Sequence, residues 1–154
     1  MLLRTTALSE AKAHLSDVMS EVVQRQRPVV VDRHRGKELM FLFAPEHMES
    51  LLSHFRFDPQ VSFDTGEVTI YSPELNLTAG GESFDEALAD LVTAAEEYAQ
   101  DFFDRQAFYA HTDRMSHLPW LLRLAITPPE ARRELFVEPP VHLSQSPEHA
   151  AALA

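Results

Sequence analysis

The chain has 154 residues, enough for one ordinary domain or two very small ones. Its 45% hydrophobic and 24% charged residues are typical of a folded protein, and the lack of cysteine excludes a disulfide framework and any thiolate metal site. No apolar run approaches the roughly 18 residues that span a bilayer, so we expect a soluble, cytoplasmic protein without a membrane partner.

The charge is distributed unevenly along the chain. Residues 1–56 hold eight Lys and Arg against seven Asp and Glu, a net charge of +1, whereas the remainder holds five against 17, a net charge of −12. Such asymmetry predicts two surfaces with different partners. The first could meet phosphate, and the second could meet a basic partner.

The first element is a helix that starts near Ser9 and ends near Gln24. Ser9 is the expected N-cap. Pro28 ends the helix, because proline disfavours helical geometry in the residue before it. Apolar residues recur at three- and four-residue steps, which places on one face Leu8, Ala11, Leu15, Val18, Met19 and Val22.

A β-hairpin is expected next. Its strands are the apolar runs at residues 29–31 and 39–43, and Gly36 allows the tight reversal between them. The tip carries Arg33, His34, Arg35 and Lys37. Pro45 then opens a short helix whose apolar face is Met48, Leu51, Leu52 and Phe55.

Residues 56–66 show no long periodic pattern and are expected to form a connection or an irregular edge. Two strands follow, one around Val68 and Ile70 and one over residues 75–79. Ser83 and Glu86 have capping-box spacing and open a long helix. Its apolar stripe is Phe84, Ala87, Leu88, Leu91, Ala95, Tyr98, Ala99 and Phe102, and its acidic face is Asp85, Asp90, Glu97, Asp101 and Asp104.

The end of the chain has a less regular pattern. The segment SHLPWLLRLAI is apolar enough to pack, and PPEARRELF restarts a helix. From Val137 onward the composition predicts a mobile tail. The elements together predict an α+β protein in three parts: a helix–hairpin–helix domain at residues 1–55, a module of two or three strands and a long helix at 56–110, and a helical and then flexible segment at 111–154.

The first part resembles the Phd/YefM family of antitoxins, also called prevent-host-death. The similarity covers about residues 3–53, in TTALSEAKAHLSDVMSEVV and RPVVVDRHRGKELMFLFAPEHMESL. The resemblance implies a dimeric DNA-binding domain on a palindromic operator upstream of its own operon. It also places Lys12 and Arg33 at the DNA, although lysine stands at position 12 for the commoner arginine and Asp32 for the usual threonine.

The residues themselves also favour contact with DNA. Arginine offers a planar fork of donors that suits guanine edges and phosphate oxygens, and a hairpin tip can reach into a groove. The alternative is that charged residues occur at the tip only because the turn is exposed to solvent. We expect the DNA-binding residues to be Arg4, Thr5, Ser9, Lys12, Arg33, His34, Arg35 and Lys37.

Residues 66–99 are similar to HicB antitoxins, a similarity carried by Pro73, Leu75, Gly81, Glu82, Ser83, Glu86 and Ala87. The resemblance implies that the second part of the chain binds a toxin. The alternatives are an ordinary solvated face for the acidic helix and core packing for the segment around Trp120. The expected toxin-binding residues are Asp90, Glu97, Asp101, Trp120, Leu121 and Leu124.

The sequence does not indicate an enzyme. The histidine spacings do not match a helical metal-binding pair, and no nucleophile turn, phosphate loop or dinucleotide fingerprint is present. We therefore expect no catalytic residue, no metal and no cofactor. The sequence predicts a bacterial type II antitoxin that neutralises a cognate ribonuclease toxin and represses its operon as a homodimer or higher oligomer. The alternative is a non-catalytic interaction or scaffold protein with an antitoxin-like fold that no longer binds DNA.

Overall fold

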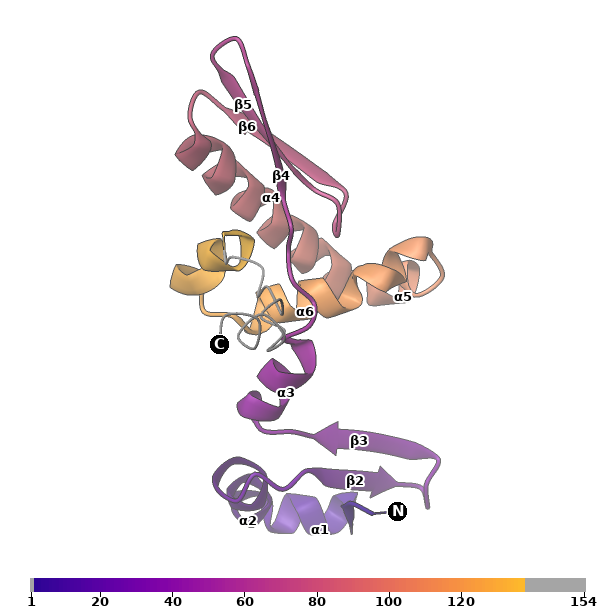
Figure 1. Ribbon diagram of the computed structural model, residues 1–154. Coiled ribbons are helices and arrows are strands. Elements are labelled where there is room, and N and C mark those ends of the chain that lie inside the picture. The colour runs from indigo at the N-terminus through magenta and orange to yellow at the C-terminus, as the bar shows by residue number, and fades with distance from the viewer. Residues whose placement is uncertain (1, 138–154) are drawn as a thin grey trace, which may run out of the picture. The chain divides into compact units, whose positions relative to one another are not determined.

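The computed structural model describes residues 2–137, and the chain divides into two compact units, Met1–His54 (unit 1) and Phe55–Ala154 (unit 2). Each unit contains one three-stranded sheet together with helices (Figure 1). The predicted α+β class is confirmed. The tail expected after Val137 lies outside the described residues. Within the described part, no helix is both long and apolar enough to cross a membrane.

The sheet of unit 1, sheet A, has the strand order β1–β2–β3. β1 (Arg4–Ala7) runs parallel to β2 (Val29–Arg33), and β2 pairs antiparallel with β3 (Glu38–Leu42). The sequence prediction found the β2–β3 hairpin but missed β1. The four residues RTTA carry no apolar alternation, so this strand depends on a ladder with a segment far along the chain.

The single helix expected at residues 9–24 is divided into three segments. α1 (Leu8–Ala13) and α2 (Leu15–Met19) are separated by His14, whose φ of −126° and ψ of 41° are not helical, and a π-helical turn η1 (Ser20–Gln24) follows. The prediction of Ser9 as N-cap was wrong. The cap position belongs to Ala7, because β1 runs directly into α1 and its last residue is extended.

The core of unit 1 lies between the helical segments and one face of β2. Val29 and Val31 are buried there against Ala11, Val18 and Val22. Part of the expected apolar stripe is not covered within the unit, since Leu15, Met19 and the nearby Val23 are exposed. α3 (Pro45–Leu52) completes the unit, with Pro45 in its first turn as predicted.

The sheet of unit 2, sheet B, is an antiparallel meander of β4 (Gln60–Asp64), β5 (Glu67–Ser72) and β6 (Leu77–Gly81). The segment expected to be a connection or an irregular edge therefore contains the edge strand β4. Gly66, at φ +85°, closes the β4–β5 turn in a conformation that glycine adopts without strain.

α4 (Phe84–Asp104) packs on β5 and β6 (Figure 1). The predicted capping box is confirmed: the Ser83 Oγ accepts a hydrogen bond from the backbone N of Glu86 at 3.2 Å, and the Glu86 carboxylate accepts one from the backbone N of Glu82 at 3.0 Å. The buried face of α4 matches most of the predicted stripe and consists of Ala87, Leu88, Leu91, Ala95, Ala99 and Phe102.

Short helices complete unit 2. They are α5 (Gln106–Tyr109), η2 (Asp113–His117), α6 (Leu118–Ile126) and η3 (Pro129–Phe136). The PPEARRELF segment restarts as a 3₁₀ helix, in which Phe136 packs against Phe57 with ring centroids 4.4 Å apart. One continuous core joins α4, α6 and η3 to sheet B.

Candidate functional site

The hairpin-tip cluster comprises Arg33, His34, Arg35 and Lys37, all of which are exposed. The chain reverses through three residues with positive φ: His34 at 59°, Arg35 at 56° and Gly36 at 85°. The carboxylate of Asp32 accepts a hydrogen bond from the backbone N of Gly36 at 2.6 Å. Asp32, which departs from the Phd/YefM pattern, thus holds the turn closed.

Only some of the cations in this cluster lack an ion-pair partner within the described chain. Arg33 donates from its Nε to the Glu38 carboxylate at 2.6 Å, and the two residues are cross-strand partners in the hairpin. This pair is about half exposed, so it stabilises the hairpin little but cancels the charge of Arg33. Arg35 and Lys37 make no ion pair with any described residue. The tip therefore presents two cations without a described ion-pair partner, and the Asp32 carboxylate at the same turn reduces its net charge to +1.

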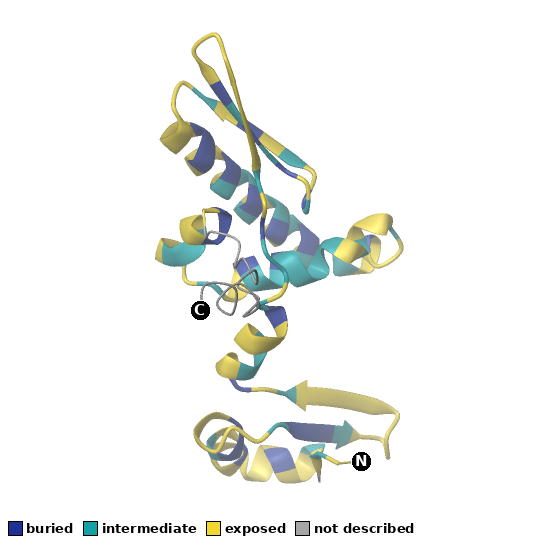
Figure 2. Ribbon diagram, in the orientation of Figure 1, coloured by how far each residue is buried: buried dark blue, intermediate teal, exposed yellow. Residues whose placement is uncertain are grey.

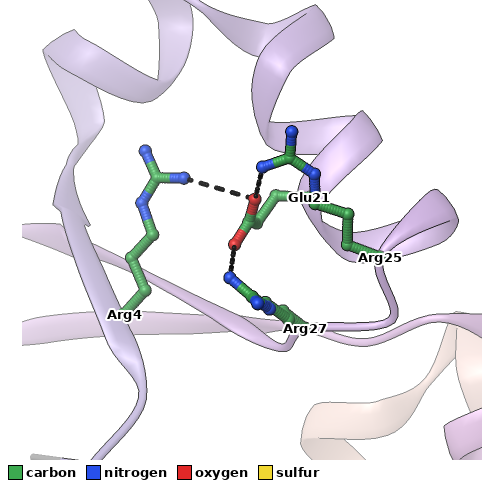
Figure 3. A network of polar contacts seen from close by, with 4 residues as sticks. All are labelled: Arg4, Glu21, Arg25 and Arg27. Carbon is green, nitrogen blue, oxygen red and sulfur yellow. Dashed lines mark hydrogen bonds and ion pairs between the residues drawn. The ribbon is translucent and has the colours of Figure 1, made fainter.

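A second group of cations, the Glu21 cluster, consists of Arg4, Glu21, Arg25 and Arg27 (Figure 3). The Glu21 side chain is only 9% exposed and accepts hydrogen bonds from Arg25 at 3.0 Å and Arg27 at 3.5 Å, while Arg4 lies 4.0 Å away. Three guanidinium groups share one carboxylate, which leaves a net charge of +2. All three arginine side chains are more than half exposed.

The two clusters lie at opposite ends of β2. The sheet register pairs Arg4 with Val29 at one end, and Arg33 with Glu38 at the other. Four strand steps of about 3.3 Å separate the two ends, a span of about 13 Å. Unit 1 therefore has cations at both ends of its central strand.

The remaining predicted DNA-binding residues lie on or before α1. Ser9 and Lys12 are exposed, and Lys12 has no ion-pair partner in residues 2–137. α1 begins beside the hairpin-tip end of the sheet, because Ala7 pairs with Asp32. Thr5 donates a hydrogen bond to the carbonyl of Leu3 at 3.4 Å. Lys12 lies in the last turn of α1, and Arg4 belongs to the Glu21 cluster.

In unit 2, Asp101 belongs to an internal network. Its carboxylate accepts a hydrogen bond from the Tyr109 hydroxyl and pairs with Arg105 at 3.4 Å. The hydrogen bond from Tyr109 lowers the pKa of Asp101, and the same bond raises the pKa of Tyr109. Asp101, which is expected to face a toxin, joins α5 to α4 in this structure.

The other acidic residues of α4 differ in whether they have a hydrogen-bond or ion-pair partner. Asp85 pairs with Arg133 of η3, and Asp90 accepts a bond from the backbone N of Gly80 at 3.4 Å. Glu97 is exposed and has no described partner. Of the acidic residues expected to bind a toxin, Glu97 is therefore the most available.

Two of the apolar residues expected to bind a toxin are core residues. Leu121 and Leu124 are 0% and 1% exposed, because this face of α6 packs against α4. Trp120 is half-buried: its indole N–H donates to the backbone carbonyl of Arg56 at 3.0 Å, and its ring packs edge-on against Phe55. Leu121 and Leu124 are thus not accessible to a partner in this structure.

A family model described as "Antitoxin of toxin-antitoxin, RelE / RelB, TA system" matches residues 1–134, which include both units and both cationic clusters. The chain belongs to this antitoxin family. Among curated proteins none matches the sequence.

A solved structure shows the same fold. It is described as an antitoxin part of a proposed toxin/antitoxin system from Syntrophomonas wolfei subsp. wolfei. The similarity has a TM-score of 0.75 at 22% sequence identity and covers 86% of this chain and 96% of the other. The antitoxin therefore shares its fold with a second chain, almost all of which the similarity covers.

The antitoxin contains a further titratable pair, Tyr98 and His117, whose hydroxyl and Nδ1 are 2.8 Å apart. Burial lowers the pKa of His117, with a contribution from Arg114, and burial raises the pKa of Tyr98. The contact joins η2 to α4. In the described part of the chain, no three His, Asp or Glu side chains come close enough together to hold a metal ion.

The sequence prediction missed Glu21, Arg25 and Arg27. The available signal was the segment QRQRP, in which two arginines follow the helix at alternate positions. That segment does not show that a carboxylate one turn earlier would collect both arginines together with Arg4. The π-helical turn and the parallel pairing of β1 bring these residues together.

Proposed function

We propose that this antitoxin binds operator DNA through unit 1 and a toxin through unit 2, in the manner of Phd/YefM antitoxins. The observation that carries the proposal is the separation of charge between the two units, with cations that have no described ion-pair partner exposed at a turn of unit 1. The DNA-binding activity would repress the operon that encodes the antitoxin. Both roles are non-enzymatic.

The distribution of cations supports the DNA-binding part of the proposal. Arg35 and Lys37 lie at one end of sheet A, the Glu21 cluster adds a net charge of +2 at the other, and Lys12 is exposed on α1. A span of about 13 Å corresponds to about four base-pair steps of 3.4 Å along the axis of a duplex. Both ends could therefore contact phosphates of one duplex.

Exposed apolar side chains in unit 1 support a homodimer. Leu15, Met19 and Val23 follow one another at steps of four residues on the helical segments, and Leu39, Met40 and Phe41 are exposed on β3. Large exposed apolar patches mark interaction sites on soluble proteins. A second copy would also supply the two-fold symmetry that a palindromic operator requires.

The composition of unit 2 supports binding of a basic toxin. Unit 2 holds six Lys and Arg against 17 Asp and Glu, a net charge of −11, which would attract a protein that binds RNA through Lys and Arg. The RelE/RelB description of the family favours a ribonuclease of the RelE type as that partner. Glu97 and Asp90 are the acidic residues of α4 that we propose face it.

The DNA-binding proposal is tested by a salt titration of binding to the chain's own promoter. Each phosphate contact contributes a slope of about −0.9 to the plot of log K against log salt concentration. Substituting both Arg35→Ala and Lys37→Ala removes up to two contacts per protomer, so we expect the slope of a dimer to fall in magnitude by as much as about 3.6.

Arg133→Ala is the matched control for the single variant Arg35→Ala, because each removes one positive charge, and Arg133 lies in unit 2, where it pairs with Asp85. We expect the control to keep the salt dependence of the wild type. If the tip variant also keeps it, the hairpin tip does not contact phosphate. If the control changes the slope as much, net charge and not the tip determines binding.

A second candidate function is an interaction protein that has lost DNA binding. The pairing of Arg33 with Glu38 favours it, since the arginine that the resemblance places at the DNA already has a partner. A mobility shift on the chain's own promoter separates the two candidates. Toxin binding is tested separately by co-expression with the product of the adjacent gene, which should be toxic alone and rescued by this chain.

A further inference from the structure

β4 is an open edge of sheet B. It pairs with β5 on one side, and no other strand of the described chain pairs with its second side. All five of its residues are exposed (Figure 2). The unpaired N–H and C=O groups along such an edge are a template for another strand.

The edge has few of the features that usually prevent pairing. Protected edges are very short or carry charges, proline or a bulge. In β4 (QVSFD) the one charge lies at the last residue of the strand, Pro59 precedes the strand, and the register with β5 is unbroken. Val61 and Phe63 are 39% and 75% exposed. They pair with Ile70 and Val68, which are buried, so they lie on the core-facing side of the sheet where α4 covers only β5 and β6.

The sequence of β4 is self-complementary when two copies pair antiparallel about Ser62. Val61 of each copy then lies opposite Phe63 of the other, and Gln60 lies opposite Asp64. Apolar residues meet apolar residues, and each carboxylate meets an amide that can donate to it. Each contact occurs twice, as two-fold symmetry requires.

We propose that β4 pairs with β4 of a second copy of this chain in this register, forming one continuous six-stranded sheet. This contact involves unit 2 and does not depend on DNA or toxin binding. A basic strand of another protein fits the edge less well, because β4 offers one carboxylate and two adjacent apolar side chains. Five-residue pairing is small beside a stable interface of about 1,200 Å², so we expect it mainly at high local concentration.

Cysteine cross-linking of the full-length protein tests the pairing, because the natural chain has no cysteine. In the proposed register, the Cα atoms of the two Ser62 residues lie about 4.5–5.5 Å apart, within disulfide range. Those of the two Asp64 residues lie four strand steps apart, about 13 Å, which is too far. Oxidised Ser62→Cys should therefore give a covalent dimer, whereas Asp64→Cys should not.

A mixture of the Gln60→Cys and Asp64→Cys proteins should also cross-link, since these positions face each other. If Ser62→Cys gives no more covalent dimer than Asp64→Cys, the proposal is overturned. In that case the edge is closed, or it serves a different protein.

Charge variants provide a second test without cysteine. Val61→Lys with Phe63→Lys places like charges opposite each other and should reduce association beyond the proposed unit 1 dimer when the full-length protein is sedimented at high concentration. Val61→Lys with Phe63→Glu places opposite charges together and should retain it. Equal association of the two variants would contradict the register.

Discussion

Leu121→Ala distinguishes a core residue from a partner-binding residue in α6. Leu121 is 0% exposed and lies in the core that joins α4, α6 and η3 to sheet B. Truncating a buried leucine to alanine costs about 2–5 kcal/mol, since it removes buried methyl groups and leaves a cavity. A loss of about 3 kcal/mol corresponds to a fall of about 6–12 °C in Tm for a chain of this size.

The assay uses the only tryptophan of the chain, Trp120, which lies next to Leu121 and packs against Phe55 within unit 2. Its fluorescence during thermal or urea unfolding therefore reports on unit 2. Ile126→Ala, at the exposed end of α6, is the matched control and should cost less than about 1 kcal/mol. The reasoning is refuted if Leu121→Ala weakens toxin binding while the unfolding transition stays unchanged.

Three further predictions follow. Gly81→Ala should destabilise unit 2 by about 1–3 kcal/mol in urea unfolding, because the added Cβ would lie 2.7 Å from the backbone N of Ala87. Gly80→Ala should leave the stability unchanged, since its Cβ would make an ordinary contact of 3.6 Å with the backbone O of Val68. Glu21→Gln should lower the Tm of unit 1, measured by circular dichroism, by an amount equivalent to about 1–2 kcal/mol. The loss is modest because the three arginines that share the carboxylate are more than half exposed. An unchanged Tm would count against the Glu21 cluster. The pKa of Asp101 is lowered in the folded state, so its contribution to stability is present above the unfolded pKa near 3.9 and is lost as pH falls through the folded pKa. Urea midpoints compared at pH 6 and pH 3 should therefore fall less in Asp101→Asn than in the wild type, and equal falls would refute this assignment.

Elements with a strong local signal were predicted correctly. The capping box at Ser83 and the apolar stripe of α4 follow from residue spacing, since they depend on contacts within one helix and its first turn. The β2–β3 hairpin and its glycine turn are likewise local. The interruption of the first helix at His14 was not predicted, because the apolar spacing continues through it.

Pairing between distant segments was not predicted. β1 has no pattern of its own, and β4 is short and exposed on both faces, so each is a strand only because of its neighbour in the sheet. The same limit applies to side chains. Arg33 was expected at DNA, but its partner Glu38 stands across the hairpin, and Asp101 reaches Tyr109 only because α5 folds back onto α4.

By itself, the amino-acid sequence determined the α+β class, the long capped helix, the cationic hairpin tip and the charge difference between the two parts. These properties depend on composition and on spacing within one element. Tertiary structure alone decided which charges are compensated and which apolar residues are buried. Arg4 meets Arg25 and Arg27 through Glu21, and Leu121 lies in the core, because packing brings together residues that the order of the chain keeps apart.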